Sequence, residues 1–329
     1  MIGNKVVLLL TIYKRFMKII TLTFSPCIDK TTSIPDLIPE KKLRCSEPVL
    51  DAGGGGINVS RAIKKLGGEA TAVYPSGGCT GKLFDQLLAR DQVPCINIQS
   101  HSETRENFIV VEEATGKQFR FGTPGTLLNE EEWQNCIKAI RDAEGAEYIV
   151  ASGSLPPGVP NDVFATIATI AKEKKARFIV DTSGEALKQA VNKGVFLLKP
   201  NLNELGALSG MPVAGTAQII EAANEILNKS ECEVVVVSMG AAGALMITKD
   251  QAEKIPAPRV TMRSTVGAGD SMLAGIVLSL TANASLLDAV RYGVACGSAA
   301  TMNPGTELCR KEDAEKLYAQ ILELSAQTT

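Results

Sequence analysis

The chain has 329 residues, of which 45% are hydrophobic and 21% are charged, and its formal net charge is −2. This length fits one large α/β domain with at most a small appendage, and the composition allows a sizeable core and excludes a wholly disordered chain. The near-neutral charge gives no reason to expect nucleic acid or an acidic membrane surface as a partner, and the single histidine, His101, excludes a histidine-rich metal centre.

Eight cysteines are scattered along the chain, and no two of them form a Cys-x-x-Cys pair. Their spacing does not match that of a structural zinc site. We interpret them as reduced thiols that are buried in a cytoplasmic protein. The single histidine also disfavours a Ser-His-Asp triad.

The first residues contain a short apolar run, Val6–Ile12, that basic residues flank. The run is too short to cross a bilayer, and the small-residue cleavage site of a signal peptide does not follow it. A regular strand pattern begins just past Met17 and extends from Lys18 to Phe24. We therefore predict that residues 1–16 are a leader outside the fold and that residues 17–329 form the folded domain.

Several charged residues near the first strand are candidates for ligand binding. Asp29 follows that strand and could bind two hydroxyls of a polyol, because a carboxylate accepts several hydrogen bonds. A turn aspartate is the alternative interpretation. Lys42, Arg44 and Arg105 could hold a phosphate of a substrate or a nucleotide, and a solvated charged face is the alternative for them.

Two stretches predict a small β-sheet that stands apart from the rest of the fold. Residues 31–51 are polar, contain prolines and have no helical period. Asn107–Phe121 has the pattern of a hairpin with its turn at Ala114–Gly116. A small sheet needs cover for its apolar face. We therefore expect residues 31–51 and 105–122 to form a lid over an active site, a contact with a second subunit, or both.

Four glycines, Gly53–Gly56, lead into a helix that is expected to open at about Ile57. Glycine permits a close approach of the backbone to a ligand. The spacing does not match a dinucleotide-binding fingerprint. Asn58, in the first turn, could offer its side-chain amide to a sugar hydroxyl. A flexible hinge between the lid and the body is the alternative interpretation, and it is compatible with the first.

From about Tyr148 onward, short apolar runs alternate with helical segments. Continuous β-branched runs such as Val234–Val237 are typical of strands that are buried on both faces of a parallel sheet. The alternation predicts a doubly wound α/β layer. Ligands bind beyond the carboxyl ends of the strands in such sheets, where many of the candidate residues fall.

Two motifs follow strands of this predicted layer. In Lys199–Glu204, Asn201 and Glu204 have the pattern of a helix-opening capping box, and capping alone would explain it. The functional alternative places Asn201 and Glu204 near magnesium-bound phosphates, through water. Ser238–Gly243 is a glycine-bearing turn that could pass under a nucleotide, although a plain β-turn would look the same.

The segment Ser264–Met272 reads Ser-Thr-Val-Gly-Ala-Gly-Asp-Ser-Met and precedes a long apolar helical pattern. Its glycines leave backbone N–H groups at the positive end of that helix, which makes a seat for an anion such as a phosphate. Asp270 could accept a proton from a hydroxyl that attacks a phosphoryl group, and an N-capping aspartate is the alternative. Because a helix N-terminus lowers the pKa of a carboxylate, we expect Asp270 to be a weak base.

Together these motifs resemble the ribokinase-like carbohydrate kinase family. The resemblance covers nearly the whole chain from Met17, with the motifs in the family's order: Gly53–Asn58, Ser152–Gly158, Lys199–Glu204, Ser238–Gly240 and Thr265–Asp270. It implies a ribokinase-like doubly wound α/β/α sandwich with a small β-sheet lid. The branch of the family that phosphorylates fructose 6-phosphate is resembled most, through Thr21–Thr23, Lys42–Cys45, Gly53–Val59, Gly153–Val159, Ser183–Leu187, Ser264–Met272 and Gly297–Thr301.

The resemblance implies ATP-dependent phosphorylation of the C1 hydroxyl of fructose 6-phosphate, a reaction of glycolysis, with Mg²⁺ as a cofactor. Kinases of tagatose 6-phosphate and of fructose 1-phosphate remain alternatives. A non-catalytic sugar-phosphate sensor is a further alternative, but the acid after Gly-Ala-Gly is intact, which argues against it. The resemblance and the need to cover the small sheet also lead us to expect a homodimer through the lid sheets.

The resemblance assigns a role to each candidate residue. Asp270 would take the proton of the C1 hydroxyl, while the backbone amides of Gly267, Ala268 and Gly269 stabilise the transferring phosphoryl group. The sugar phosphate would contact Asp29, Gly54, Asn58, Arg44, Arg105 and Ser154. The nucleotide would contact Lys42, Lys199, Asn201, Glu204, Ser238, Gly240, Gly243 and Ser298. Of these residues, Asn201 and Glu204 would also hold Mg²⁺ through water. The positions that hold a monovalent cation such as K⁺, mostly through carbonyls, are Ser264, Val266, Ala300, Asn303 and Gly305.

Overall fold

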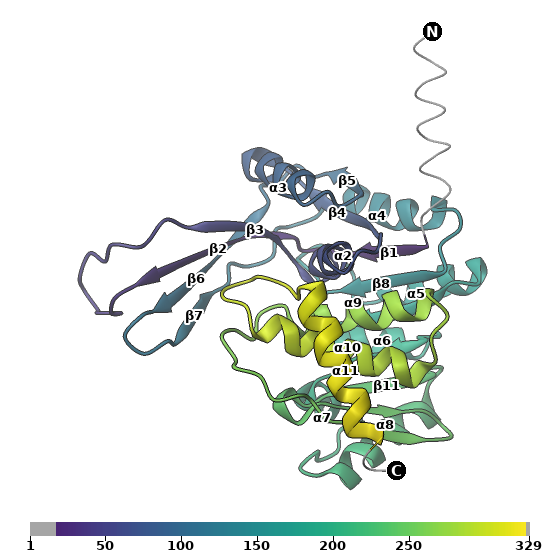
Figure 1. Cartoon of the computed structure of the whole chain (residues 1–329). Coiled ribbons are helices and arrows are strands. Elements are labelled where there is room, and N and C mark those ends of the chain that lie inside the picture. The colour runs from purple at the N-terminus through teal and green to yellow at the C-terminus, as the bar shows by residue number, and fades with distance from the viewer. Residues whose placement is uncertain (1–17, 327–329) are drawn as a thin grey trace.

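The computed structural model describes residues 18–326, so the predicted leader at residues 1–16 lies outside the described residues. Within them, one sheet of nine strands has the order β13-β12-β11-β10-β9-β8-β1-β4-β5, and a second sheet of four strands has the order β3-β2-β6-β7. The four-stranded sheet projects from one side of the body that the large sheet and the helices form (Figure 1).

The large sheet is parallel from β5 to β11 and antiparallel at β12 and β13. Its strands are β1 (Ile19–Leu22), β4 (Thr71–Ser76), β5 (Cys95–Gln99), β8 (Tyr148–Ser152), β9 (Arg177–Asp181), β10 (Leu197–Leu198), β11 (Val234–Ser238), β12 (Ala244–Ile247) and β13 (Ala252–Ile255). The apolar runs predicted as strands from Tyr148 onward are therefore confirmed, although β10 covers only the last two residues of its apolar run, Val195–Leu198.

Alternate side chains of the large sheet enter two separate apolar cores. In β1, for example, Ile20 and Leu22 pack into one core and Ile19 into the other, because successive side chains of a strand point to opposite faces. One face is covered by α4 (Glu130–Asp142), α5 (Val163–Lys174), α6 (Gly184–Val191), α7 (Leu202–Ser209) and α8 (Thr216–Lys229). The other face is covered by α2 (Gly55–Lys65), α9 (Ala268–Thr281), α10 (Leu286–Thr301) and α11 (Lys311–Ala326). The predicted α/β/α sandwich is confirmed.

The four-stranded sheet, which we call the lid sheet, consists of two separate pieces of the chain. One piece supplies β2 (Cys27–Ile34) and β3 (Val49–Gly53), and the other supplies the predicted hairpin, β6 (Arg105–Glu112) and β7 (Gln118–Phe121). Asp29 lies inside β2, so the alternative of a turn aspartate is wrong. At the base of the sheet, α3 (Gly78–Arg90) packs with Ile28 and Ala52 in a third apolar cluster.

The cysteines differ in their exposure to solvent. The expectation that the cysteines are buried is wrong for Cys45, Cys79 and Cys95, which are exposed. The remaining five thiols are buried. Between residues 18 and 326, we find no helix that combines the length and the apolar character needed to span a membrane.

Candidate active site

The four-glycine segment brings α2 against the carboxyl ends of two central strands. A Cβ on Gly56 would lie 2.5 Å from the carbonyl oxygen of Leu22, at the end of β1, and a Cβ on Gly55 would clash with Ser152, at the end of β8. Thr23 completes the contact, because its hydroxyl accepts a hydrogen bond of 2.9 Å from the backbone N–H of Ile57. Close packing is therefore the local reason for the glycines, and α2 begins at Gly55, two residues before the predicted start.

The segment before α9 forms an open helix N-terminus. Its N-cap is Gly267, whose φ of +71° is left-handed, and no described side chain caps the helix there. A Cβ at this position would also lie 2.6 Å from Cδ2 of Leu308. The first N–H groups of an α-helix have no partner inside the helix, so this end of α9 can bind an anion.

Asp270 lies in the first turn of α9 and points to α2. The Nδ2 of Asn58 donates a hydrogen bond of 3.0 Å to its Oδ2. Because Gly267 is the N-cap, the alternative of an N-capping aspartate is wrong. The structure thus joins two predicted residues that are far apart in the chain, and no residue between 18 and 326 donates a hydrogen bond to the second carboxylate oxygen of Asp270.

The environment of Asp270 makes it a stronger base than the sequence led us to expect. Burial, and after it the negative charge of Asp181, raise its pKa to about 7, although the hydrogen bond from Asn58 and the charge of Lys199 act in the opposite direction. The expectation of a lowered pKa is therefore wrong, because the helix end contributes only about half an elementary charge. A carboxylate that titrates near neutral pH is suited to general-base catalysis.

A buried ion pair lies beside the start of α9. Lys199 follows β10, is only 5% exposed, and places its Nζ 3.1 Å from Oδ2 of Asp181, at the end of β9. Burial would lower the pKa of Lys199, but Asp181, Asp270 and Glu204 raise it, so the ammonium group keeps its charge. Nζ would lie 3.3 Å from a Cβ on Gly269, which places a positive charge next to the first turn of the helix.

Sequence reasoning missed Asp181 as a site residue. The available signal was its position at the carboxyl end of a buried strand, and a similar position, just after a strand, pointed to Lys199. A cavity of about 240 Å³ brings Asp181 together with Asp270 and other residues. Its lining consists of Gly55, Ser152, Gly153, Ser154, Asp181, Thr182, Ser183, Glu204 and Asp270. A larger cavity, of about 640 Å³ between β5 and α4, contains none of the predicted site residues.

On the lid side of Asp270, the base of the lid sheet holds a second carboxylate. Asp29 is buried, and Nδ2 of Asn107 donates a hydrogen bond of 3.0 Å to its Oδ1. Burial raises the pKa of Asp29, and the charge of Asp29 in turn contributes to the raised pKa of Asp270. Asn107 is a residue that sequence reasoning missed, although it lies in the hairpin that was predicted. Gly54 is the N-cap of α2.

Arg105 also lies at the base of the lid sheet. Its two Nη atoms donate to the carbonyl oxygens of Thr123 and Ser25, at 3.0 and 3.2 Å. Its Nε is buried, and within residues 18–326 it has no hydrogen-bond partner. In contrast, Lys42 and Arg44 are exposed and belong to the 35–48 segment, which forms the tip of the lid sheet far from α9 (Figure 1). A single chain therefore does not bring Lys42 and Arg44 to the cavity.

The candidate nucleotide residues lie around the start of α7. Asn201 and Glu204 form both hydrogen bonds of a capping box, each 2.9 Å long, so the capping interpretation is confirmed. Glu204 also lines the 240 Å³ cavity, and Ser238 pairs with Asn201 through a β-bridge.

The glycine-bearing turn after β11 contains a short 3₁₀ helix from Gly240 to Ala242. A Cβ on Gly243, at the end of this turn, would clash with Ile255, so β13 packs closely there. Ser298 is half-buried on α10.

The predicted cation ligands come together from two segments, 264–266 and 300–306, which we call the candidate cation loops. The hydroxyl of Ser264 donates a hydrogen bond of 2.6 Å to the carbonyl oxygen of Gly305, and Nδ2 of Asn303 donates to the carbonyl oxygen of Leu308 at 2.9 Å. Val266 belongs to the first of these segments, and its backbone N–H donates to Oγ of Ser264 at 3.2 Å. Ala300 begins the second segment and still lies in the last turn of α10.

The chemistry of these loops fits a singly charged cation better than a divalent one. Their oxygens are neutral carbonyls and hydroxyls, and carbonyl oxygens can replace the hydration shell of K⁺. Among the described residues, no group of three or more His, Cys, Asp or Glu side chains could hold a metal ion.

Comparisons with known proteins agree with this geometry. The family model of the pfkB family carbohydrate kinases matches residues 21–313. The chain is similar to the ATP-dependent 6-phosphofructokinase isozyme 2 of Escherichia coli, with 45% identity over 306 residues that cover 93% of this chain and 99% of that protein. It is 29% identical to the 1-phosphofructokinase of Bacillus subtilis over 303 residues, which cover 92% of this chain and 98% of that protein.

A solved structure is also similar, that of phosphofructokinase-2 from Escherichia coli in complex with potassium. The TM-score is 0.89 at 45% identity, and the match covers 93% of this chain and all of that one. This similarity to a solved structure confirms the predicted fold class independently of the strand order described above.

Proposed function

Because the chain belongs to the pfkB family of carbohydrate kinases, we propose that it transfers the γ-phosphoryl group of ATP to the C1 hydroxyl of fructose 6-phosphate. The observation that carries the proposal is the contact between Asn58 and Asp270, which holds a base of raised pKa at the open N-terminus of α9. The product is fructose 1,6-bisphosphate, and the reaction is a step of glycolysis. Residues 17–329 are the kinase domain in this proposal.

In the proposed reaction, Asp270 accepts the proton of the C1 hydroxyl while O1 forms a bond to the γ-phosphorus. The bond from that phosphorus to the bridging oxygen breaks, and ADP leaves. The backbone amides of Gly267, Ala268 and Gly269 and the ammonium group of Lys199 stabilise the negative charge of the transferring group. Little proton transfer is needed early in a loose transition state, and a pKa near 7 leaves about half of the Asp270 side chains ionised at neutral pH.

Binding of the two substrates is divided between the lid sheet and the body. Asp29, Gly54, Asn58 and Ser154 orient the sugar, and Arg105 contacts its 6-phosphate. ATP binds at Lys199, Ser238, Gly240, Gly243 and Ser298. Because Lys42 and Arg44 lie at the lid tip, they reach a bound phosphate only from the lid sheet of the second subunit that we propose below. Asn201 and Glu204 hold Mg²⁺ through water, and the ion supplies charge neutralisation for the phosphates when it is bound. The Nε of Arg105 supports its role, because it has no hydrogen-bond partner among residues 18–326 and leaves one donor of the guanidinium for a phosphate oxygen.

The choice of sugar phosphate rests on relative similarity. The identity is 45% to a 6-phosphofructokinase and 29% to a 1-phosphofructokinase. Comparing kcat/KM for fructose 6-phosphate, tagatose 6-phosphate and fructose 1-phosphate tests the choice directly. A preference for either rival substrate would overturn the assigned sugar but leave the kinase assignment intact. The absence of any sugar-dependent ADP production would instead favour a non-catalytic sensor.

We further propose that K⁺ binds in the candidate cation loops, that the lid sheet closes over the sugar, and that two subunits associate through their lid sheets. Exposed apolar side chains on the lid sheet support the last point: Val49, Phe108 and Phe121. A monomeric mass in light scattering at micromolar concentration would refute the dimer. A cytoplasmic location completes the proposal, and recovery of the protein in a membrane or secreted fraction would contradict it.

A further inference from the structure

The lid sheet contacts the candidate cation loops at three points. The hydroxyl of Thr306 donates a hydrogen bond of 2.8 Å to Oδ2 of Asp51, in β3. From β7, Nη2 of Arg120 donates to the hydroxyl of Thr265 at 2.9 Å. From β2, the side chain of Thr31 packs on Gly305, where a Cβ would lie 3.0 Å from Cγ2 of Thr31. Three of the four lid strands therefore meet the loops that carry the candidate cation ligands.

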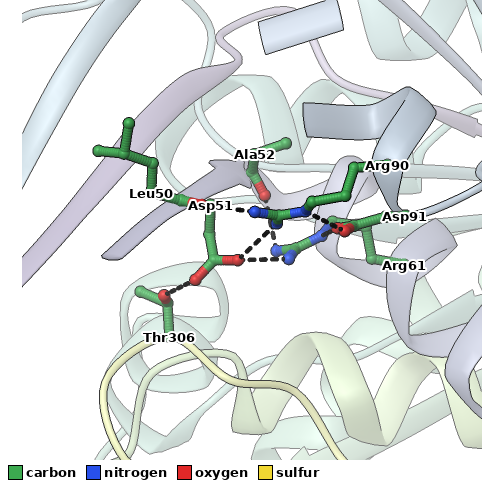
Figure 2. A network of polar contacts seen from close by, with 7 residues as sticks. All are labelled: Leu50, Asp51, Ala52, Arg61, Arg90, Asp91 and Thr306. Carbon is green, nitrogen blue, oxygen red and sulfur yellow. Dashed lines mark hydrogen bonds and ion pairs between the residues drawn. The ribbon is translucent and has the colours of Figure 1, made fainter. Parts of the chain in front are cut away.

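Of the lid residues in these three contacts, Asp51 has the most hydrogen-bond and ion-pair partners. Its Oδ1 lies 2.7 Å from Nη2 of Arg61, and the same guanidinium donates to Asp91 at 2.6 Å and to the carbonyl oxygen of Ala52 at 2.8 Å (Figure 2). Arg90 approaches Asp51 from the solvent side at 3.4 Å. Arg61 is buried on α2, so one oxygen of Asp51 is bound to the body of the protein and the other to Thr306.

The position of Asp51 connects the sugar side of the site with the phosphate side. Asp51 lies directly opposite Asp29 in the pairing of β3 with β2. The helix that holds Asp51 through Arg61 also carries Asn58, one turn earlier, and Asn58 contacts Asp270. Thr306 follows Gly305, whose carbonyl oxygen accepts the hydrogen bond from Ser264. One carboxylate is thus bonded both to α2, which carries Asn58, and to the segment that carries Thr306.

An unsatisfied hydroxyl lies at the same junction. Oγ1 of Thr31 is buried, and it has no hydrogen-bond partner among residues 18–326. It would lie 3.4 Å from a Cβ on Gly305. Buried polar groups are normally hydrogen-bonded, so the contact between β2 and the 300–306 loop has polar capacity that the present arrangement leaves unused. A small shift of the loop would change this contact and the bond of Thr306 together.

We propose that Asp51 is a positioning residue that couples the lid sheet to the candidate cation loops through Thr306, so that binding of a monovalent cation orders the lid sheet. The coupling rests on the cation site of the proposed function. It is reciprocal, because ordering of the lid by the sugar must raise the affinity for the cation by the same factor as the cation raises the affinity for the sugar. Asp51 itself touches neither substrate.

The test uses Thr306→Val, which removes the hydroxyl group of Thr306 and keeps the shape of the side chain. Hydrogen–deuterium exchange of peptides from 27–53 and 105–121 is measured in potassium chloride and in tetramethylammonium chloride at equal ionic strength. In the unmodified protein, potassium is expected to slow the exchange of these peptides. In Thr306→Val this protection is lost, and the potassium concentration for half-maximal activity rises about tenfold, a typical size for a coupling between two sites.

Three further variants separate positioning from folding. Thr306→Ser keeps the hydroxyl and is expected to restore the response to potassium. Asp51→Asn removes the charge, and combined with Thr306→Val it is expected to have a less than additive effect, because the two residues share one bond. Arg90→Gln removes the exposed partner of Asp51 and should leave the response unchanged. Thermal unfolding of each variant identifies a loss that comes from misfolding.

Two results would overturn the coupling. One is an unchanged potassium response of the lid peptides in both Thr306→Val and Asp51→Asn. The other is the absence of any potassium response in the unmodified protein. In that second case, turnover of fructose 6-phosphate in potassium-free buffer would show that the kinase assignment stands. Absence of turnover in both salts would point instead to a failure of the proposed function itself.

Discussion

The helices α7 and α9 both begin at the same cavity, but only one of them is capped by its own side chains. At α7, Asn201 and Glu204 satisfy the free N–H groups with a complete capping box. At α9, Gly267 stands at the N-cap, and no described side chain takes that role. A helix end that is capped by its own residues is stable without a ligand, whereas an end that is left open has its N–H groups free for one. The comparison shows capping at α7 and leaves anion binding at α9 as the proposed role of its open end.

The strongest test of the comparison removes the base at the open helix. Asp270→Asn should keep the fold and nucleotide binding but lower kcat by about 10²–10⁴-fold, because a positioned general base contributes that much. The measurement is steady-state turnover of fructose 6-phosphate, with nucleotide affinity from calorimetry as the control. Turnover near that of the unmodified protein would remove Asp270 from the mechanism.

A second test changes the glycine that keeps α9 open. Gly267→Ala introduces a Cβ at a φ of +71° that also approaches Leu308, so we expect the anion seat to be distorted and kcat to fall by about 10²-fold, the effect of losing one oxyanion donor. Gly210→Ala is the matched control. Gly210 has a φ of +70°, and no described heavy atom would lie within 4 Å of its Cβ.

Both glycine variants should lose about 1 kcal/mol of unfolding free energy from the left-handed backbone. Only Gly267→Ala should lose turnover beyond that expected from its stability. Equal activities of the two variants, measured at a temperature where both are folded, would show that the open helix end has no catalytic role.

A third test asks whether α7 does more than cap itself. Glu204→Gln keeps a side chain that a capping box accepts, so the unfolding free energy should hardly change. The loss of the charge should raise the Mg²⁺ concentration for half-maximal activity about tenfold, as substitutions around a metal site commonly do. An unchanged Mg²⁺ dependence, together with destabilisation in Asn201→Ala, would confine the motif to capping.

The smallest expected effect concerns pH. Burial and then Asp181 raise the pKa of Asp270 to about 7, so kcat/KM should fall as the pH decreases below about 7, because the base becomes protonated. Asp181→Asn should move this acid limb to lower pH. The limb is read from kcat/KM between pH 5 and 9, and an acid limb at the same pH in Asp181→Asn would contradict the assignment.

The contribution of Asp270 to the free energy of unfolding should fall as the pH rises, whereas kcat/KM should rise. A carboxyl whose pKa is higher in the folded than in the unfolded chain binds its proton more tightly when folded. Asp270 therefore contributes stability at low pH that is lost as the pH rises from about 4 to about 7. Comparing the unfolding free energy of Asp270→Asn with that of the unmodified protein across this range should show the difference vanish toward low pH.

The body of the fold could be predicted from the sequence because its signals are local. Continuous apolar runs mark strands such as β8 and β11, and the spacing of glycines marks the starts of α2 and α9. The link between Asn58 and Asp270 is not local, but each residue belongs to a motif that could be recognised by itself. Family resemblance then placed both at one site.

The parts that failed depend on neighbours that the sequence does not reveal. The pKa of Asp270 was misjudged because its burial, which is the main cause of the raised value, and the negative charge of Asp181, at the end of β9, arise only in the folded chain. Asp51 and Thr306 carry no recognisable motif, and only the fold places them in contact. Lys42 and Arg44 were expected near ATP and the sugar phosphate. Their segment lies at the lid tip of a single chain, so their roles stay predictions that need a second subunit.

The parallel pairing of β2 with β6 has a mechanical consequence. Both strands leave the body at the same level, since Cys27 pairs with Arg105 and Asp29 with Asn107, and they run outward together as far as Ile34 and Glu112. At about 3.3 Å per residue, Asp29 lies about 7 Å from this common base and Ile34 about 23 Å. If the sheet swings about its base, it acts as a lever whose outer end travels furthest. Asp29, the acid that orients the sugar in the proposed reaction, lies next to this base. The outer ends of the strands would therefore move on opening and closing while the orientation of the Asp29 carboxylate hardly changes.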